Sequence, residues 1–158
     1  MIFEDILRDL LVSFNLVDNR VFLLRAPQSP ASQAVTPYLV FLPVGPEPLH
    51  AHSGPVALVR EEYQFSIFDT SQSRALALAA SLRQRLDGLR GDFEGVTFGG
   101  VFYRSKTTSY EDDTRLFQAI VSYFIQCRVP DSILARESRQ QQQRQQQRQY
   151  ALKETTKP

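Results

Sequence analysis

The chain has 158 residues and a mass of 18.0 kDa, and 42% of its residues are hydrophobic and 11% aromatic. This size suits one domain with an ordinary core, and the composition argues against wholesale disorder. The formal net charge of +1 excludes a uniformly basic nucleic-acid binder and a strongly acidic mimic of nucleic acid. Residues 1–128 carry 12 Lys and Arg against 14 Asp and Glu, a charge of −2, whereas residues 129–158 carry 6 against 3, a charge of +3. The near-neutral total therefore combines a slightly acidic body with a basic C-terminal segment.

The single cysteine, Cys127, excludes an intramolecular disulfide and any zinc site that needs several cysteines. Because it lies in an apolar, strand-like run, we expect a buried, inert thiol. No apolar run approaches the ~18 residues of a membrane span. Glu4, Asp5 and Asp9 interrupt the apolar residues at the N-terminus, which is not typical of a signal peptide. We therefore expect a soluble protein without a membrane partner, made for a cytoplasm or for something assembled there.

The N-terminal residues predict an amphipathic helix over residues 2–14. One continuous helical stripe contains Phe3, Ile6, Leu7, Leu10, Leu11 and Phe14. Glu4 and Asp5 would lie in the first turn, where the helix dipole favours negative charge.

Three stretches before the second helix have the composition of strands: residues 21–24, 38–44 and 56–68. In the third stretch, Tyr63, Phe65 and Ile67 alternate with polar residues, which is typical of a sheet with one face in water. Residues 45–55 contain two glycines and three prolines, so we expect an irregular loop there.

A second helix is predicted over residues 72–88. Ser71 and the two residues before it offer side-chain oxygens that can cap its start, and Gly88 allows the left-handed conformation that often ends a helix. Its apolar stripe is formed by Ala75, Ala79, Leu82, Leu86 and Leu89, widened by Leu76.

Two further strands are predicted over residues 95–106 and 116–127, with a bulge or bend at Gly99–Gly100 and a polar turn over residues 109–113. The element order predicts an α+β fold. We expect a mostly antiparallel sheet of four to five strands, packed with an N-terminal helix and a central helix. Residues 1–128 would form this domain, and residues 129–158 an extended or helical C-terminal arm.

The arm is the segment whose composition indicates a partner. Residues 139–149 are all Arg or Gln, which favour helix but leave no apolar face to dock one. Four arginines could neutralise phosphates weakly, in a salt-dependent way. A protein surface is at least as good a target, because glutamine both donates and accepts hydrogen bonds.

No arrangement of residues in the sequence predicts catalysis or a cofactor. His50 and His52, with Glu47 nearby, could bind a metal, but a solvated loop is the better interpretation because prolines and glycines surround them. Glu111, Asp112 and Asp113 lack the alternating spacing of a calcium loop and favour a solvated turn. We therefore expect neither an enzyme nor a bound metal.

Several segments follow one another in a recognisable order. They are Pro37–Phe41, Tyr63–Asp69 running into Ser71, the helix residues Ala75, Ala79, Leu82 and Leu86–Gly88, and Tyr110–Asp113. In this order they resemble the tail-completion or tail-terminator family of tailed bacteriophages, small proteins of the head–tail neck. The resemblance covers about residues 1–128 and leaves out the proline-rich loop and the arm.

The resemblance implies a structural virion protein, assembled in the host cytoplasm, that is not an enzyme and needs no cofactor. It would form a ring, expected to be hexameric, that ends the tail tube and joins it to the head connector, stopper or adaptor protein. DNA would be passing cargo in its channel. The alternatives are a stopper or adaptor of the same neck, and a nucleic-acid-binding module that acts through the arm.

We expect a contact between subunits or rings near the glycine pair, along the turn that follows it and along the arm. The candidate interface residues are Gly99, Gly100, Arg104, Lys106, Tyr110, Glu111, Asp112, Asp113, Arg136, Arg139, Arg144 and Arg148.

Overall fold

The computed structural model describes residues 3–27, 35–51, 54–128, 142–143 and 145–147, with residues 46–51 and 54–59 described by their backbone only. Up to Arg128 it contains two helices and six strands. In chain order they are α1 (Phe3–Ser13), β1 (Val21–Leu23), β2 (Tyr38–Ala51), β3 (Gly54–Asp69), α2 (Gln72–Leu86), β4 (Gly91–Phe93), β5 (Val96–Glu111) and β6 (Leu116–Arg128). Residues 142–143 and 145–147, within the arm, are helical.

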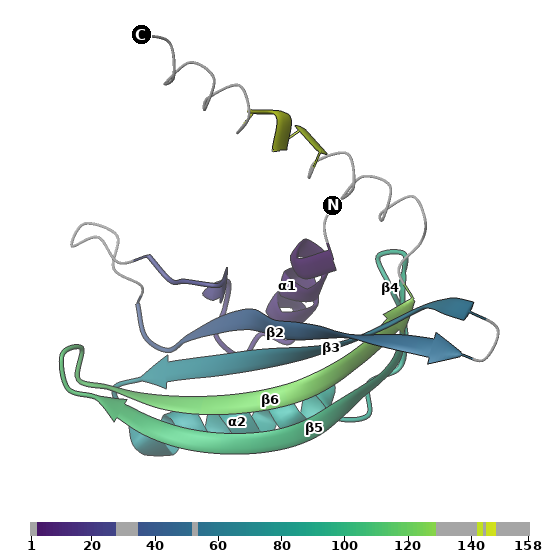
Figure 1. Ribbon diagram of the computed structural model, residues 1–158. Helices are drawn as coiled ribbons and strands as arrows, with labels where there is room; N and C mark the ends of the chain where they lie inside the picture. Colours follow the sequence, from purple (N-terminus) through teal and green to yellow (C-terminus); the bar gives the residue numbers. More distant parts are fainter. Residues whose placement is uncertain (1–2, 28–34, 52–53, 129–141, 144, 148–158) are drawn as a thin grey trace, which may run out of the picture.

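The six strands form one curved sheet in the order β1-β2-β3-β6-β5-β4 (Figure 1). β1 is parallel to β2, and the other neighbouring strands are antiparallel. The predicted α+β fold with a mostly antiparallel sheet is therefore confirmed, but the sheet has six strands rather than four to five. The sequence did not reveal β4, because three residues are too few to show a periodic pattern.

The predicted irregular loop over residues 45–55 is wrong. β2 and β3 continue through this region as a long antiparallel pair that closes with Ala51 opposite Gly54. The prolines are tolerated because β1 covers only residues 39–41 of β2, which leaves the rest of its outer side as a sheet edge. Register shifts between Pro43 and Gly45 and between Pro48 and His50 accommodate the missing donors.

A single hydrophobic core lies between one face of the sheet and both helices. β3 and β6 supply its centre, because their alternate residues are buried on that face, as the period-two pattern of β3 predicted. α1 lies against the same face, and its predicted apolar stripe is buried from Phe3 to Leu11. The Tyr63 hydroxyl donates to Glu61 Oε2 at 2.9 Å and also reaches Glu4 of α1. Burial, followed by these two carboxylates, raises the pKa of Tyr63.

α2 begins at the predicted cap and covers the core side of β3, β6 and β5 (Figure 1). The Ser71 hydroxyl accepts a hydrogen bond from the Arg74 backbone N–H. Arg74 also donates a second hydrogen bond, from its guanidinium to the carboxylate of the fully buried Asp69, at 2.7 Å. The helix ends at Leu86, and Gly88 follows with φ +79°, the left-handed conformation expected of it.

The opposite face of the sheet has no helix over it among the described residues (Figure 1). At one end, Ala26 from the segment after β1 packs with Tyr38 and Val40 of β2 and with Leu116 of β6 in a small second cluster. Tyr38 also stacks on Phe68, with ring centres 4.9 Å apart. The rest of this face carries a mixture of polar and half-buried apolar side chains.

β5 and β6 form a hairpin that is longer than predicted. β5 extends to Glu111 rather than ending near Lys106, and the turn occupies residues 112–115 rather than 109–113. The polar residues of this stretch suggested a turn, whereas in the structure they pair with β6. The predicted bulge is confirmed by a register shift between Phe98 and Gly100.

We expect Leu82→Ala to lower the free energy of unfolding by about 2–5 kcal/mol, because Leu82 is fully buried under the sheet and its loss leaves a cavity. Leu78→Ala, on the same helix at a half-buried position, should cost clearly less. Urea denaturation followed by circular dichroism measures both. Equal losses would contradict this placement of the core.

Candidate assembly surface

The described residues hold no group of three or more His, Cys, Asp and Glu side chains that could bind a metal ion. The alternative metal site at His50 and His52 is not covered by this statement, because the side chains of Glu47, His50 and His52 are not among the described atoms. Within the described ranges, no helix is long and apolar enough to cross a membrane.

Cys127 is buried near the end of β6 and forms no disulfide. Burial, followed by the negative charge of Glu61, raises the pKa of its thiol to about 12, well above the ordinary value of 9.0. A thiol that keeps its proton is a poor nucleophile and a poor metal ligand. The prediction that this cysteine is buried is confirmed.

We expect thiol reagents to label Cys127 only after unfolding. Since its pKa is raised in the folded state, the thiol contributes stability below pH 9, and this contribution is lost as the pH rises toward 12. Between about pH 8 and about pH 10, the free energy of unfolding should therefore fall less in Cys127→Ala than in the natural chain. Denaturation curves at both pH values test this, and rapid labelling of the folded protein would contradict it.

Eight of the twelve predicted interface residues lie on the β5–β6 hairpin or its turn. Gly99 and Gly100 lie in the first half of β5, at the register shift. Gly100 is buried, and a Cβ atom there would lie 2.6 Å from the Phe102 ring. The glycine pair therefore shapes the strand itself. The arm residues Arg136, Arg139, Arg144 and Arg148 lie outside the described residues.

Arg104 lies on the uncovered face of the sheet and is already engaged within the chain. Its guanidinium forms an ion pair with Glu62 of β3 and lies 5.1 Å from the centre of the Phe124 ring on β6. Arg60 of β3 lies over the same ring at 4.3 Å. Arg104 thus connects three strands, and the interactions within its own chain account for its position.

The distal half of β5 projects into solvent on both faces. Every residue from Arg104 to Glu111 is exposed, including Lys106. One edge of this segment pairs with β6 as far as Glu111 opposite Leu116, whereas β4 pairs only with residues 96–98. Alternate residues therefore direct N–H and C=O groups toward an edge that no strand of the described chain covers.

The edge strand at the other side of the sheet is protected by hydrogen bonds. The Val21 carbonyl accepts a bond from Arg8 Nε at 3.2 Å, and the Leu23 carbonyl accepts one from the Arg25 N–H at 2.7 Å. Beyond β1, β2 contains three prolines, which have no N–H to donate to another strand. These are familiar devices against unwanted strand pairing.

The first half of β5 is protected as well. After the short β4, the Val101 carbonyl accepts a bond from the Gly88 N–H at 2.8 Å, and the Tyr103 N–H donates to Asp87 Oδ1 at 3.1 Å. A second register shift follows between Tyr103 and Ser105. Beyond it, the edge continues to Glu111 without a cover of this kind among the described residues, so this segment is the best candidate for pairing with another chain.

The tip of the hairpin is acidic. Glu111 ends β5 and accepts a hydrogen bond from the Thr114 hydroxyl at 2.5 Å, while Asp112 and Asp113 lie exposed in the turn. Tyr110 is 48% exposed, and its ring centre lies 4.7 Å from that of Phe117 across the hairpin. The tip therefore combines an accessible aromatic side chain with three carboxylates.

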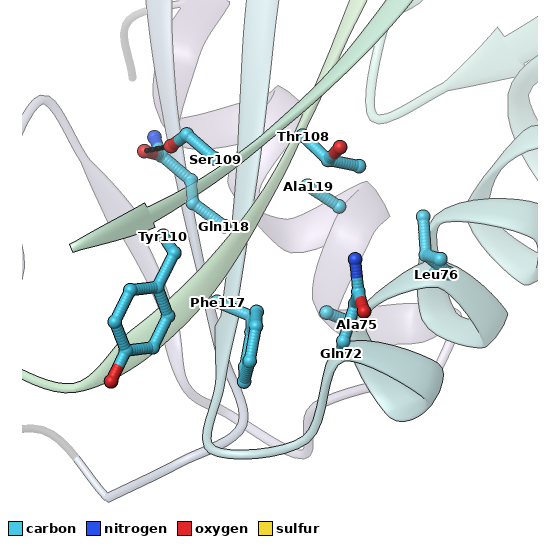
Figure 2. Close-up of a pocket in the computed structure, with 9 residues that line it drawn as sticks. All are labelled: Gln72, Ala75, Leu76, Thr108, Ser109, Tyr110, Phe117, Gln118 and Ala119. Carbon is cyan, nitrogen blue, oxygen red and sulfur yellow. Dashed lines mark hydrogen bonds between the residues drawn. The ribbon is translucent and has the colours of Figure 1, made fainter.

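A pocket of about 200 Å³ lies where the distal hairpin meets the first turns of α2. Figure 2 shows its lining, which comes from Gln72, Ala75 and Leu76 of α2, from Thr108–Tyr110 of β5 and from Phe117–Ala119 of β6. Ala75 and Ala119 are buried, and their small side chains leave the space open. Ser109 donates a hydrogen bond to Gln118, and Figure 2 shows both side chains directed away from α2.

The sequence predictions located the hairpin but missed the pocket. Tyr110 was predicted to lie at an interface, whereas Gln72, Leu76, Thr108 and Phe117 were not. Residues of α2 come close to the hairpin only through strand pairing across β3 and β6, and no local pattern in the sequence carries that information.

The family model of the tail completion protein gp17 matches residues 8–126 of the chain, from within α1 to near the end of β6. The chain belongs to this tailed-bacteriophage family. Membership makes it a structural protein of a virion tail, and it confirms the resemblance seen in the sequence.

One solved structure shows the same fold as this family member. A chain in the virion of a native gene transfer agent (GTA) particle is 13% identical, with a TM-score of 0.56 over 74% of this chain and 83% of that one. A second solved structure is 19% identical over 78% and 89% of the two chains, and its TM-score of 0.45 is too low to establish a common fold. No curated protein matches the chain.

Proposed function

We propose that this protein forms a hexameric ring that ends the tail tube and joins it to the head connector or a stopper or adaptor protein. The observation that carries the proposal is the family match over residues 8–126, which runs from within α1 to near the end of β6. The similar chain in the gene transfer agent virion supports a place in a phage-like particle. In this role the protein binds neighbouring proteins and needs neither a catalytic residue nor a cofactor.

The distal hairpin is the part of the body best suited to these contacts. Ser105–Glu111 offers an edge that no strand among the described residues covers, Tyr110 is accessible, and the acidic turn projects beyond the core. A ring repeats one heterologous contact until it closes, so a surface of this kind needs a different, complementary surface on the next copy.

The body and the arm would have separate tasks. β6 ends at Arg128, which supports a boundary between a ring-forming body over residues 1–128 and an arm over residues 129–158. The body has a charge of −2, so DNA can pass through the ring without being held by it. The arm, with a charge of +3, would lie along a neighbouring subunit or the next ring.

The ring is tested by sizing the purified full-length protein. Light scattering should give the mass of a hexamer, alone or after mixing with tail tube protein, and negative-stain images should show rings with a central channel. A protein that stays monomeric under both conditions would count against the ring.

Deleting residues 129–158 should weaken ring formation or the joining of tails to heads, because the arm supplies a contact beyond the body. A matched control replaces Arg136, Arg139, Arg144 and Arg148 with glutamine, which keeps the length of the arm and removes its positive charge. Unchanged assembly after deletion would contradict a docking role. Tight, salt-sensitive DNA binding that both variants lose would instead favour the nucleic-acid-binding alternative.

A further inference from the structure

A ring contact needs two different surfaces on each chain, and the pocket beside α2 has the features of one of them. Its floor is apolar, with the buried Ala75 and Ala119 at the bottom. Tyr110 stands at its mouth with half of its surface exposed, and the ring of Phe117 packs beside it (Figure 2). A pocket of about 200 Å³ suits a single aliphatic side chain rather than a large ligand.

The complementary feature is Leu24, which follows β1. Its side chain is 63% exposed, although leucine is among the residues most often buried. Its backbone has φ +63°, a left-handed conformation that is rare and strained for a residue with a bulky side chain. Such strain persists where the surroundings impose it and is often found at functional sites.

Hydrogen bonds on both sides hold Leu24 in this conformation. Its N–H donates to the Phe41 carbonyl of β2 at 2.8 Å, and the next N–H, of Arg25, donates to the Leu23 carbonyl at 2.7 Å. The backbone of the exposed leucine is therefore fixed in place, so little backbone entropy would be lost when its side chain inserts into a partner.

The two features lie toward opposite edges of the sheet. Strand pairing places Val21, Leu39, Ile67, Ala119 and Thr108 in one row that crosses β1, β2, β3, β6 and β5. Leu24 follows Val21 by three residues, about 10 Å along the strand direction from one end of this row, and Thr108, on the pocket lining, lies at the other end. A contact between opposite sides of a subunit is what a closed ring repeats.

The charges around the two features are complementary. Arg25, beside Leu24, is exposed. Beside the pocket, the hairpin tip carries Glu111 and the exposed Asp112 and Asp113. An aliphatic side chain followed by a cation thus faces an apolar pocket flanked by carboxylates, which favours this orientation of two copies over like-to-like contact.

We propose that Leu24 of one copy inserts into the pocket formed by α2, β5 and β6 of the next copy, with Arg25 facing the acidic tip. The occupant is a second copy of this chain. The proposal rests on the proposed ring and specifies the contact that closes it.

The direct test is a pair of engineered cysteines in the full-length protein, Leu24→Cys with Thr108→Cys. The native Cys127 is buried, so it can be left in place. Under mild oxidation the double variant should give a ladder of cross-linked species that ends at the hexamer, at least about tenfold above either single variant, because a disulfide requires closely spaced Cβ atoms. No ladder from rings that are visible by negative stain would overturn the proposal.

The single variants separate this contact from its competitors. Dimers from Thr108→Cys alone would indicate that two β5 edges pair with each other, and would overturn the assignment of Leu24. Leu24→Asp should abolish rings, whereas the control Val44→Asp, at another exposed apolar residue, should leave them intact. Circular dichroism melting verifies that both variants fold.

The two levels of the proposal fail differently. Rings that persist in Leu24→Asp would overturn the Leu24 contact and leave the ring itself in place. Absence of rings in the natural protein under all conditions, together with absence of a ladder, would overturn both.

Discussion

The architecture depends on the need to remove one face of a curved sheet from water. β3 and β6, at the centre, place Tyr63, Phe65 and Tyr123 on that face, and both helices serve to cover it. This cover extends only as far as α2 reaches. Where α2 begins, the hairpin continues beyond the core, and the small Ala75 and Ala119 leave the pocket between them. The candidate assembly surface is thus a consequence of where the core ends.

Periodic patterns in the sequence revealed the elements that form the core. The stripe of α1, the alternation in β3 and the capped start of α2 are local signals, and the structure confirms them. The predictions were wrong where the composition favoured a loop or turn but the segment is paired with a neighbouring strand. The prolines after Leu42 suggested a loop, but they are compatible with an edge strand. The polar stretch that ends at Glu111 suggested a turn, but β6 provides a partner along its whole length.

The candidate site was predictable only in part. Local sequence placed Tyr110 and the acidic residues after it on a turn between strands, which is where contacts between proteins often occur. The pocket depends on distances between α2, β5 and β6, which become known only once the strand order is known. The exposure and strain of Leu24 are properties of the folded backbone, and a leucine after an apolar strand gives no sign of them in the sequence.

The unequal protection of the sheet edges limits how the protein can aggregate. Within the described chain, Arg8 and the prolines of β2 hinder strand pairing at one edge of the sheet. Asp87 does the same at the first half of β5. Strand stacking into a fibril requires an acceptor edge at both ends of every molecule. A copy that can add a strand at one end alone stops growing after the first addition. The same arrangement that leaves the Ser105–Glu111 edge unpaired in the described chain therefore disfavours extension into fibrils by strand addition.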